Sequence, residues 1–491
     1  TRRSSDLYLR YSMAQRDKYK LLEWLHRAEA ESDVLAWRAG GIHLWPFIRH
    51  KITYEYVHVK QISLPFPIRT FRKVQLIFKG AFECLQLMLS RKAIDFIFLS
   101  KATYRAMIND VWMDRFCDSI IEFAGAEARR KSLILESGVD MKYRKPRFRN
   151  ESVQGVQGIL YLLGILAPVI GRIRKSQYTL SGFSEFKQRF SELVDVRLTL
   201  SEQVIKKQFD RVLVLADFFE WYLKRVEVKK VFLVCFHEEY GYAMTLACSR
   251  LGIPSVDIQH GVEGRYHYVY TPYLKIPATG FDLVPDKFWV WDTISFDNIL
   301  NWGNENHTPF LGGNVWLKHC QANKVDVNLE LSKPVILVSL QPLEDALPDM
   351  LLEAMRDTAN VYYWFLRMHP RQFSERQLLE DRLDQYGLLE SVNLNEASNL
   401  PLPVLLNLAS VHITQWSSVV FEAFEMGVPS IVIHQTGKMM YQTEEFEKDF
   451  VYFSDTADDL KMKVGELKDK KRFLENEQVA YADRVKSFVN F

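Results

Sequence analysis

Short apolar runs, separated by stretches long enough to carry helices, recur along most of this chain. The runs are mostly continuous and do not alternate apolar with polar residues, which is typical of parallel strands covered on both faces. They fall at 93–100, 132–136, 230–236, 254–259 and 287–291 in the first half, and at 334–340, 361–367, 411–414 and 430–434 in the second. The pattern predicts an α/β fold, with helices such as 243–251, 348–357 and 418–426 between the strands.

The length of 491 residues allows two separate hydrophobic cores. Two successive strand–helix units without a short repeat predict two Rossmann-like, doubly wound domains. We expect a helical, aromatic-rich region at 1–90 packed on the first domain. The first domain itself is expected at 91–316 and the second at 317–491, with Leu311-Gly-Gly-Asn314 as the turn that leaves the first.

Charge and cysteine usage narrow the class of protein. The formal net charge of +2 does not argue for nucleic acid as a partner. The cysteines are widely scattered and none forms a CxxC pair, which argues against a disulfide framework and against a zinc site. Such cysteines are typical of core thiols in a reducing compartment, so we expect a cytoplasmic protein. They are Cys84, Cys117, Cys235, Cys248 and Cys320.

One uncharged stretch, 152–171, bears on membrane contact. Its apolar part, 159–170, is too short to span a bilayer core of about 30 Å, and Pro168 interrupts it. Basic residues flank it at 142–149 and 172–175, which suits the surface of an anionic membrane. The alternative is a helix buried in a core or a dimer. We therefore expect at most a peripheral contact with the inner face of the cytoplasmic membrane.

In open α/β sheets, ligands bind beyond the carboxyl ends of the strands. Arg367-Met-His-Pro-Arg371 directly follows one strand-like run. His369 can donate a hydrogen bond to a phosphate, while Arg367 and Arg371 supply fixed positive charge. The alternative is a polar strand end with solvated arginines.

Thr414-Gln-Trp-Ser-Ser418 joins another run to a helix. Ser417 and Ser418 lie near the helix N-terminus, where backbone N–H groups favour anions, and Gln415 precedes them. Glu422, one turn into the helix, can accept hydrogen bonds from a ribose. Simple helix capping explains the serines equally well.

A third motif, Gln259-His260-Gly261, ends the run at 254–259, and its loop continues with Glu263 and Arg265. A neutral histidine there can deprotonate an acceptor hydroxyl, with the loop residues as acceptor-binding groups. Glu238 and Glu239 follow the preceding run and are rival bases. They are also explained as acids that complement a helix dipole.

The order of these motifs resembles that of GT-B transferases with cytidine-nucleotide donors. The His-Pro and Ser-Ser pairs and the Gln-His-Gly turn are similar to those of bacterial sialyltransferases, capsule Kdo transferases and CDP-glycerol glycerophosphotransferases. The resemblance covers roughly residues 230–435. It implies two Rossmann-like domains facing a central cleft, with the donor bound by the second.

By that resemblance, His369 contacts the donor phosphate, Ser417 and Ser418 bind it with the helix N-terminus, and His260 is the base. Sialyltransferases instead use an acidic-acidic-Gly motif, which Glu238 and Glu239 match incompletely because Tyr240 precedes Gly241. No Asp-x-Asp motif is present, so neither a metal nor a cofactor is expected beside the CMP-sugar donor.

The resulting hypothesis is an inverting, metal-independent glycosyltransferase. It would move Kdo or a sialic-acid-like sugar from a CMP donor to a bacterial surface glycan or lipid-linked acceptor, as in capsule or lipopolysaccharide biosynthesis. One alternative keeps the fold with CDP-glycerol or a UDP- or GDP-sugar as donor. Another class is an isomerase resembling UDP-sugar 2-epimerases, and a third is a non-catalytic glycan-binding subunit.

Overall fold

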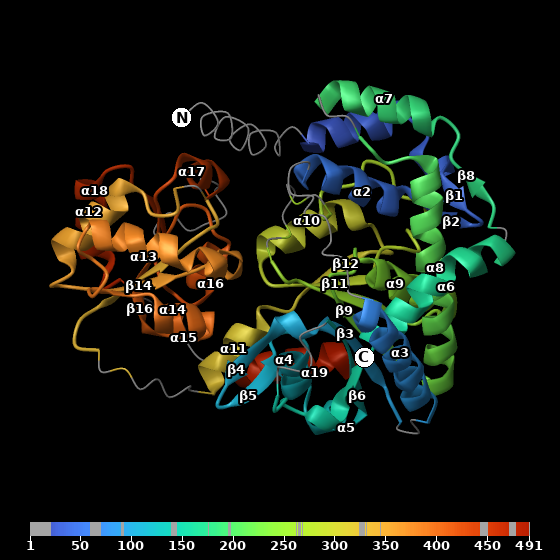
Figure 1. The fold of residues 1–491 in the computed structure, drawn as a ribbon, viewed down its shortest axis with the longest axis horizontal. Coiled ribbons are helices and arrows are strands. Elements are labelled where there is room, and N and C mark those ends of the chain that lie inside the picture. The colour runs from blue at the N-terminus through green and yellow to red at the C-terminus, as the bar shows by residue number, and fades with distance from the viewer. Residues whose placement is uncertain are drawn as a thin grey trace. The chain divides into compact units, whose positions relative to one another are not determined.

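The computed structural model describes residues 21–58, 70–89, 93–138, 145–174, 176–194, 198–261, 263, 267, 269–323, 329, 331–343, 345–441, 450–470 and 478–490. The chain forms two compact units, each with its own parallel sheet (Figure 1). Unit 1 comprises Thr1–Arg105, Asp114–Asn314 and Ala482–Phe491. Unit 2 comprises Ala106–Met113 and Val315–Tyr481.

Unit 1 is built on a seven-stranded sheet of order β12-β11-β10-β9-β3-β6-β7, in which each neighbouring pair is parallel. The chain fills the sheet outward from β3 to β7 and then outward again from β9 to β12. The strand order therefore reverses between β3 and β9. The strands are β3 Phe96–Lys101, β6 Ser132–Ser137, β7 Val153–Gly155, β9 Lys230–Val234, β10 Ser255–Ile258, β11 Lys287–Val290 and β12 Thr308–Leu311.

Helices cover this sheet, and the N-terminal part of the chain joins the same hydrophobic core. Trp37, Trp45 and Phe47 are fully buried in that core. The helices are α2 Trp45–His58, α3 Thr70–Leu89, α4 Cys117–Ala124, α5 Ala126–Lys131, α6 Gln157–Arg174, α7 Phe183–Val194, α8 Glu202–Val226, α9 Glu239–Leu251 and α10 Thr293–Gly303. Short strands β1 Arg38–Ala39, β2 Ile42–His43 and β8 Tyr178–Thr179 form a small separate sheet, and β4 Arg105–Ile108 pairs with β5 Val111–Asp114.

Unit 2 repeats the architecture with a six-stranded parallel sheet of order β15-β14-β13-β16-β17-β18. Its strand order reverses between β13 and β16. The strands are β13 Val335–Ser339, β14 Tyr363–Arg367, β15 Val392–Asn393, β16 Ala409–Thr414, β17 Ser430–Val432 and β18 Val451–Phe453. The helices are α11 Val315–Ala322, α12 Asp349–Thr358, α13 Arg376–Gln385, α14 Asn395–Asn399, α15 Leu402–Leu408, α16 Val419–Glu425, α17 Gln435–Tyr441 and α18 Ala457–Leu467, with the 3-10 helix η5 Pro370–Glu375 after β14.

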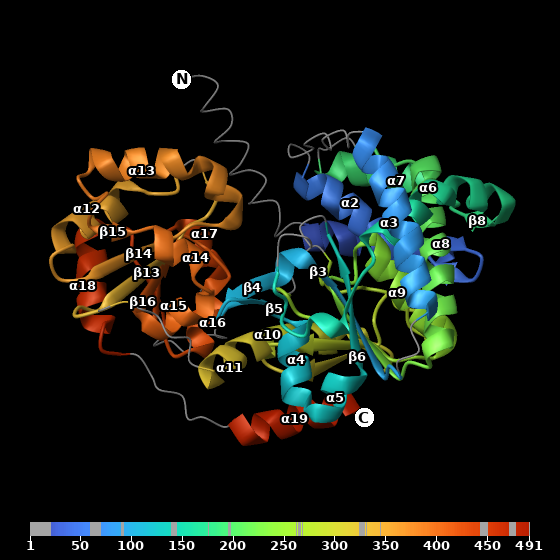
Figure 2. The same cartoon turned by 60° about the horizontal axis from the view of Figure 1, so that its bottom comes forward.

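The predicted α/β class with two Rossmann-like domains is confirmed, and each predicted apolar run overlaps a parallel strand. The units part between Asn314 and Val315, at the Gly-rich turn. The prediction placed all of 317–491 in the second domain, whereas Ala482–Phe491 belongs to unit 1. That return is made by helix α19, Gln478–Asn490 (Figure 2). Its Phe488 ring stacks on Phe310 at 3.8 Å between centroids.

Helix α6 differs from the sequence prediction, because it continues through Pro168 for 18 residues. Among the described residues it is the one helix long and apolar enough, by length and composition, to cross a membrane, and 17% of it is buried. It lies against α3, where Gly158 and Gly80 meet so closely that a Cβ on Gly158 would lie 2.4 Å from the Gly80 nitrogen. Of the alternatives left open by the sequence, a helix buried in a core does not fit, because α6 has one packed face and one exposed face.

Candidate functional site

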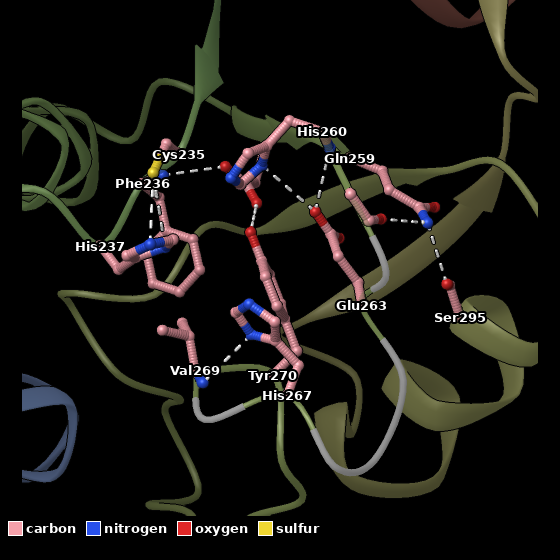
Figure 3. Close-up of polar contacts among 12 residues, drawn as sticks. Cys235, Phe236, His237, Gln259, His260, Glu263, His267, Val269, Tyr270 and Ser295 are labelled. Atoms are coloured by element: carbon pink, nitrogen blue, oxygen red, sulfur yellow. Dashed lines mark hydrogen bonds and ion pairs between the residues drawn. The ribbon is translucent and has the colours of Figure 1, made fainter. Parts of the chain in front are cut away.

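Three potential ligand groups meet beyond the carboxyl ends of β9 and β10 in unit 1 (Figure 3). Cys235 directly follows β9, and its Sγ lies 3.2 Å from Nε2 of His237. His260 follows β10, and its ring centroid is 6.0 Å from that of His237. One ligand atom from each residue lies within 4.8 Å of the others. Two adjacent strand ends therefore gather a thiol and two imidazoles.

The imidazoles of this cluster are held in their neutral form. His237 is buried, which, together with the neighbouring His50, His260 and His267, lowers its pKa well below the usual value. Burial also lowers the pKa of His260, although its side chain remains 22% exposed. Neutral imidazole nitrogens can accept a hydrogen bond or bind a metal.

Buried acids and a tyrosine lie directly behind His260 (Figure 3). The Tyr270 hydroxyl donates to Asp257 Oδ2 at 2.7 Å, and the Phe236 backbone N–H donates to Asp257 Oδ1 at 3.0 Å. The backbone N–H of His260 donates to Glu263 Oε1 at 3.3 Å, and His260 Nδ1 lies 3.5 Å from the same oxygen. Burial, and then the nearby Glu263, raises the pKa of Asp257 to about 8. These buried groups support the His260 side chain on the side away from solvent.

A partly exposed ion pair borders the cluster at the point where the strand order of unit 1 reverses. Lys101, the last residue of β3, pairs with Glu238 at the N-cap of α9. The Glu238 carboxylate makes no capping hydrogen bond, and the two side chains are 26% and 30% exposed. Glu239 instead pairs with Arg211 of α8 at 3.1 Å. Both acids are ion-paired and about equally exposed, at 30% and 31%, and Glu238 is the one whose charge acts on His260.

A buried charge network lies at the ends of β3 and β6 in the same unit. Arg105 pairs with Glu136 and, at 3.4 Å, with Asp118. The Ser100 hydroxyl donates to Asp114 Oδ2 at 2.6 Å. Burial, and then the neighbouring Asp114, raises the pKa of Asp118 to about 7.

The remaining predicted acceptor residues are placed differently. Gln259 is buried, its Nε2 donates to Gly261 O at 2.8 Å, and its Oε1 accepts from the Trp291 backbone N–H at 2.6 Å. It therefore fixes the loop from within. Glu263 is also buried behind His260, and Arg265 lies outside the described residues.

In unit 2, the predicted phosphate-binding residues after β14 mainly hold local structure. Arg367 Nη1 donates to the backbone oxygens of Ala397 at 3.0 Å and Leu400 at 2.6 Å. His369 Nδ1 accepts from the Arg371 backbone N–H at 3.1 Å and caps η5. The Arg371 side chain is exposed.

The predicted residues around β16 lie where the strand order of unit 2 reverses. Gln415 Nε2 donates to Asp345 O at 2.9 Å, and Ser417 Oγ accepts from the Val419 backbone N–H at 3.4 Å. Ser418 is the exposed N-cap of α16 and makes no side-chain capping bond. Glu422 is half-buried on the same helix. A cavity of about 300 Å³ lies nearby in unit 2, with His434, Gln435 and Lys438 in its lining.

Sequence reasoning missed Lys101, Cys235, His237 and Tyr270 at the unit 1 site. One signal was present: Cys235 and His237 are two positions apart at the end of a strand-like run, a spacing that can place two side chains on one side. This pair was overlooked because the sequence was searched for paired cysteines and not for a cysteine beside a histidine.

No protein-family model matches the chain, and no curated protein matches it. Solved structures do match. A UDP-GlcNAc 2-epimerase from Methanocaldococcus jannaschii aligns over 80% of this chain and 98% of its own, at 12% identity and a TM-score of 0.50. A putative UDP-N-acetylglucosamine 2-epimerase from Listeria monocytogenes aligns over 80% and 91% at 14% identity, with a TM-score of 0.44. The glycosyltransferase of kitacinnamycin aligns over 82% and 95% at 12% identity, with a TM-score of 0.39.

The two parallel-sheet Rossmann-like units and the match to the M. jannaschii structure give this chain the GT-B fold. The comparison corrects the sequence-based function. The structure that matches at a TM-score of 0.50 is a UDP-GlcNAc 2-epimerase, so the predicted transfer of Kdo or sialic acid from a CMP donor, with its capsule and lipopolysaccharide context, is wrong. The similarity to the M. jannaschii structure agrees with the epimerase-like alternative. At 12% identity, this similarity establishes the fold alone.

Proposed function

We propose that this chain is an enzyme that converts a UDP-sugar without an acceptor, by inverting carbon 2 of the sugar as a 2-epimerase does. The fold likeness to the M. jannaschii UDP-GlcNAc 2-epimerase supports the class, since the match covers nearly the whole of that chain. The observation that carries the proposal is the placement of two partly exposed side chains, Glu238 at the strand-order reversal of unit 1 and His260 at the end of the neighbouring strand β10. Ligands of open α/β sheets bind at such points.

The required chemistry fits these side chains. A base removes the hydrogen of carbon 2 as a proton while the C1–O bond breaks, so the electron pair forms a C1=C2 double bond and UDP leaves. An acid then returns a proton to the opposite face of carbon 2 as the UDP oxygen bonds to carbon 1 again. Glu238 is an accessible carboxylate whose position is fixed by Lys101. His260 presents a neutral imidazole beside it, oriented by Glu263. No acceptor hydroxyl has a part in this reaction.

The nucleotide is assigned by the same proposal to the carboxyl edge of the unit 2 sheet. Ser418 and Arg371 are exposed there, and Lys438 lines the nearby cavity. The positive charges of Arg371 and Lys438 suit a diphosphate. His369, Ser417 and Glu422 stay candidate nucleotide contacts, and Arg367 and Gln415 support them through backbone hydrogen bonds.

The reaction is tested by incubating the purified chain with UDP-GlcNAc in D₂O, without acceptor. We expect the C2 epimer to form with deuterium at carbon 2, seen by NMR, because the abstracted proton exchanges with solvent. Release of free sugar without the epimer, or an unchanged substrate, contradicts the proposal.

Nucleotide preference gives an independent check. A ligand that binds only the folded protein raises the melting temperature by mass action. We expect UDP to raise it more than CMP, CDP or GDP. A larger shift with CMP would contradict the uridine assignment while leaving the fold unaffected.

We further propose that unit 1 contacts an anionic membrane surface through the exposed faces of α3 and α6. These adjacent helices hold large exposed apolar side chains, among them Phe78 at 72%, Leu89 at 69% and Ile173 at 76% exposure. Exposed apolar patches of this kind mark interaction sites.

The positive charge of the exposed α3 and α6 faces favours an anionic membrane over a second copy of the chain as the binding partner. Neither helix has an exposed acid, since the one acidic residue, Glu83, is buried and accepts from the Gly158 backbone N–H at 2.8 Å. Lys73 and Arg172 are exposed beside the apolar side chains. Two such faces would repel each other, whereas anionic headgroups attract them.

Liposome flotation tests this contact. We expect the protein to float with phosphatidylglycerol vesicles and not with phosphatidylcholine vesicles, and Phe78→Glu with Phe82→Glu to abolish flotation. Leu378→Glu is the matched control, because Leu378 is an equally exposed apolar residue of unit 2. A chain that does not float and forms a dimer that Phe82→Glu dissociates would contradict the membrane assignment.

A further inference from the structure

We propose that unit 1 binds a divalent transition metal, with Zn²⁺ best suited, through Cys235 Sγ and the imidazoles of His237 and His260. This departs from the sequence-based expectation of a metal-free protein. The inference concerns binding and does not depend on the proposed reaction. Only the catalytic role of a bound metal rests on the proposed function.

The three side chains come from two neighbouring strand ends. Cys235 and His237 lie just beyond β9, and His260 lies just beyond β10, which pairs with β9 in parallel. In a tetrahedral zinc site with Zn–S near 2.3 Å and Zn–N near 2.0 Å, neighbouring ligand atoms are about 3.5 Å apart. Cys235 Sγ and His237 Nε2 are already 3.2 Å apart, and all three ligand atoms lie within 4.8 Å. Small side-chain rotations are enough to close the site.

The backbone at Cys235 supports this assignment. Its φ is +74°, in the left-handed region that a non-glycine residue rarely adopts. Such strain persists where the surrounding structure enforces it, and it is concentrated at functional sites. Here the strained turn places the thiol beside the His237 ring (Figure 3).

Glu263 supplies the outer support that metal-binding histidines usually have. Its Oε1 accepts from the His260 backbone N–H and lies 3.5 Å from His260 Nδ1. No hydrogen bond joins these two atoms at 3.5 Å, so closing the site would include a small movement of the ring towards Glu263, which would then orient it and leave Nε2 for the metal. Glu263 is 1% exposed, so this support is isolated from solvent.

The ligand set defines the metal and its chemistry. One sulfur and two imidazole nitrogens favour zinc and similar ions over magnesium or calcium, which prefer oxygen. Three protein ligands leave a fourth position open, as in catalytic zinc sites. His260 is 22% exposed, so that position is reached from the side bordered by Glu238. With metal bound, His260 would be a ligand and would not carry a proton, so under the proposed function Glu238 would remain the base and the metal would polarise a substrate oxygen at the open position.

Cobalt spectroscopy of the full chain, treated with a chelator and free of nucleotide, tests the site. We expect added Co²⁺ to give visible bands of tetrahedral geometry and a thiolate-to-metal charge-transfer band. Cys235→Ser should lose the charge-transfer band, and Glu263→Gln should weaken Co²⁺ binding by about 10- to 100-fold. Cys248→Ser is the matched control, because Cys248 is a fully buried thiol of α9 in the same unit.

Two results would overturn the metal site. One is a wild-type chain that binds neither Co²⁺ nor Zn²⁺ at micromolar concentration; the other is a spectrum that Cys235→Ser leaves unchanged. If Cys235→Ser does not fold, as judged by circular dichroism, His260→Asn at the partly exposed ligand serves instead and should shift the d–d bands. A chain that binds Co²⁺ through Cys235 but converts no UDP-sugar supports the metal site and overturns the proposed reaction.

Discussion

The carboxyl edges of the two sheets share one topology and use their polar residues in opposite ways. In unit 1, the edge gathers accessible or strained groups: Glu238 makes no capping bond, and Cys235 adopts a left-handed backbone. In unit 2, polar side chains at the edge are bound to backbone, as Arg367 is to the carbonyls of Ala397 and Leu400. The comparison teaches that a polar strand-end residue is available to a ligand only where it is not required to hold the loop, which at the unit 2 edge leaves exposed residues such as Arg371.

The largest expected effect is at Glu238. Glu238→Gln keeps the size of the side chain and removes its basicity, so carbon 2 inversion should slow by about 10²- to 10⁴-fold. The measurement is kcat for UDP-GlcNAc in the NMR assay. Glu239→Gln is the matched control, because Glu239 is an ion-paired acid of similar exposure whose partner is Arg211 of α8, and it should retain activity within about tenfold. Equal losses in both variants would break the distinction between the two acids.

The next effect concerns stability in unit 2. Arg367→Ala removes two charge-assisted hydrogen bonds to backbone carbonyls, and these typically stabilise by about 1.5–3 kcal/mol each. We expect faster hydrogen exchange in peptides of β14, β15 and α14, with unit 1 peptides unchanged. Arg371→Ala, at an exposed position, should leave exchange unaltered. Normal exchange with weakened UDP affinity would instead show that Arg367 is a ligand residue.

A pH effect is expected from the buried network of unit 1. The folded-state pKa of Asp118 is about 7, mainly because of burial, whereas the unfolded value is about 3.9. The folded protein therefore retains a proton that the unfolded chain has lost, so the unfolding free energy falls as pH rises from about 4 to 7. The slope is at most about 1.4 kcal/mol per pH unit for one proton. Asp118→Asn should flatten it in urea denaturation at several pH values. An unchanged slope would assign the titration to another group.

The smallest effect separates two roles for His369. If its ring mainly caps η5, His369→Ala should cost about 1 kcal/mol of local stability, and His369→Asn should restore it, since Asn is a good cap. UDP affinity, measured by calorimetry, should stay the same in both variants. Loss of affinity in both, with stability restored only by Asn, would make His369 a phosphate ligand as the sequence motif suggests.

Much of the fold could be predicted from the sequence, because continuous apolar runs specify buried parallel strands directly. The runs at 230–236 and 334–340 correspond to β9 and β13, the central strands of their sheets. Edge strands such as β15 and β18 were missed, since two or three residues leave no periodic signal. The helical return of Ala482–Phe491 was missed because its partners, Phe310 and Trp289, are distant in sequence.

The site was predicted less well than the fold. His260 and Glu238 were singled out because they directly follow strand runs, and their roles stay predictions. Whether a polar side chain is free could not be predicted, since Arg367 and Gln259 are held by backbone groups that only the tertiary structure brings near. Cys235 was dismissed by the absence of a paired cysteine, although its partners are histidines from two strands.

The return of α19 has a consequence for how this chain is synthesised and can be divided. Unit 2 is inserted between parts of unit 1, so its residues Val315–Tyr481 leave the ribosome before Ala482–Phe491 do. Until then, Trp289 and Phe310 lack the ring of Phe488 that covers them. During synthesis, unit 2 is therefore complete before unit 1. A cut after Tyr481 destabilises unit 1, although the cut lies next to unit 2 in the sequence.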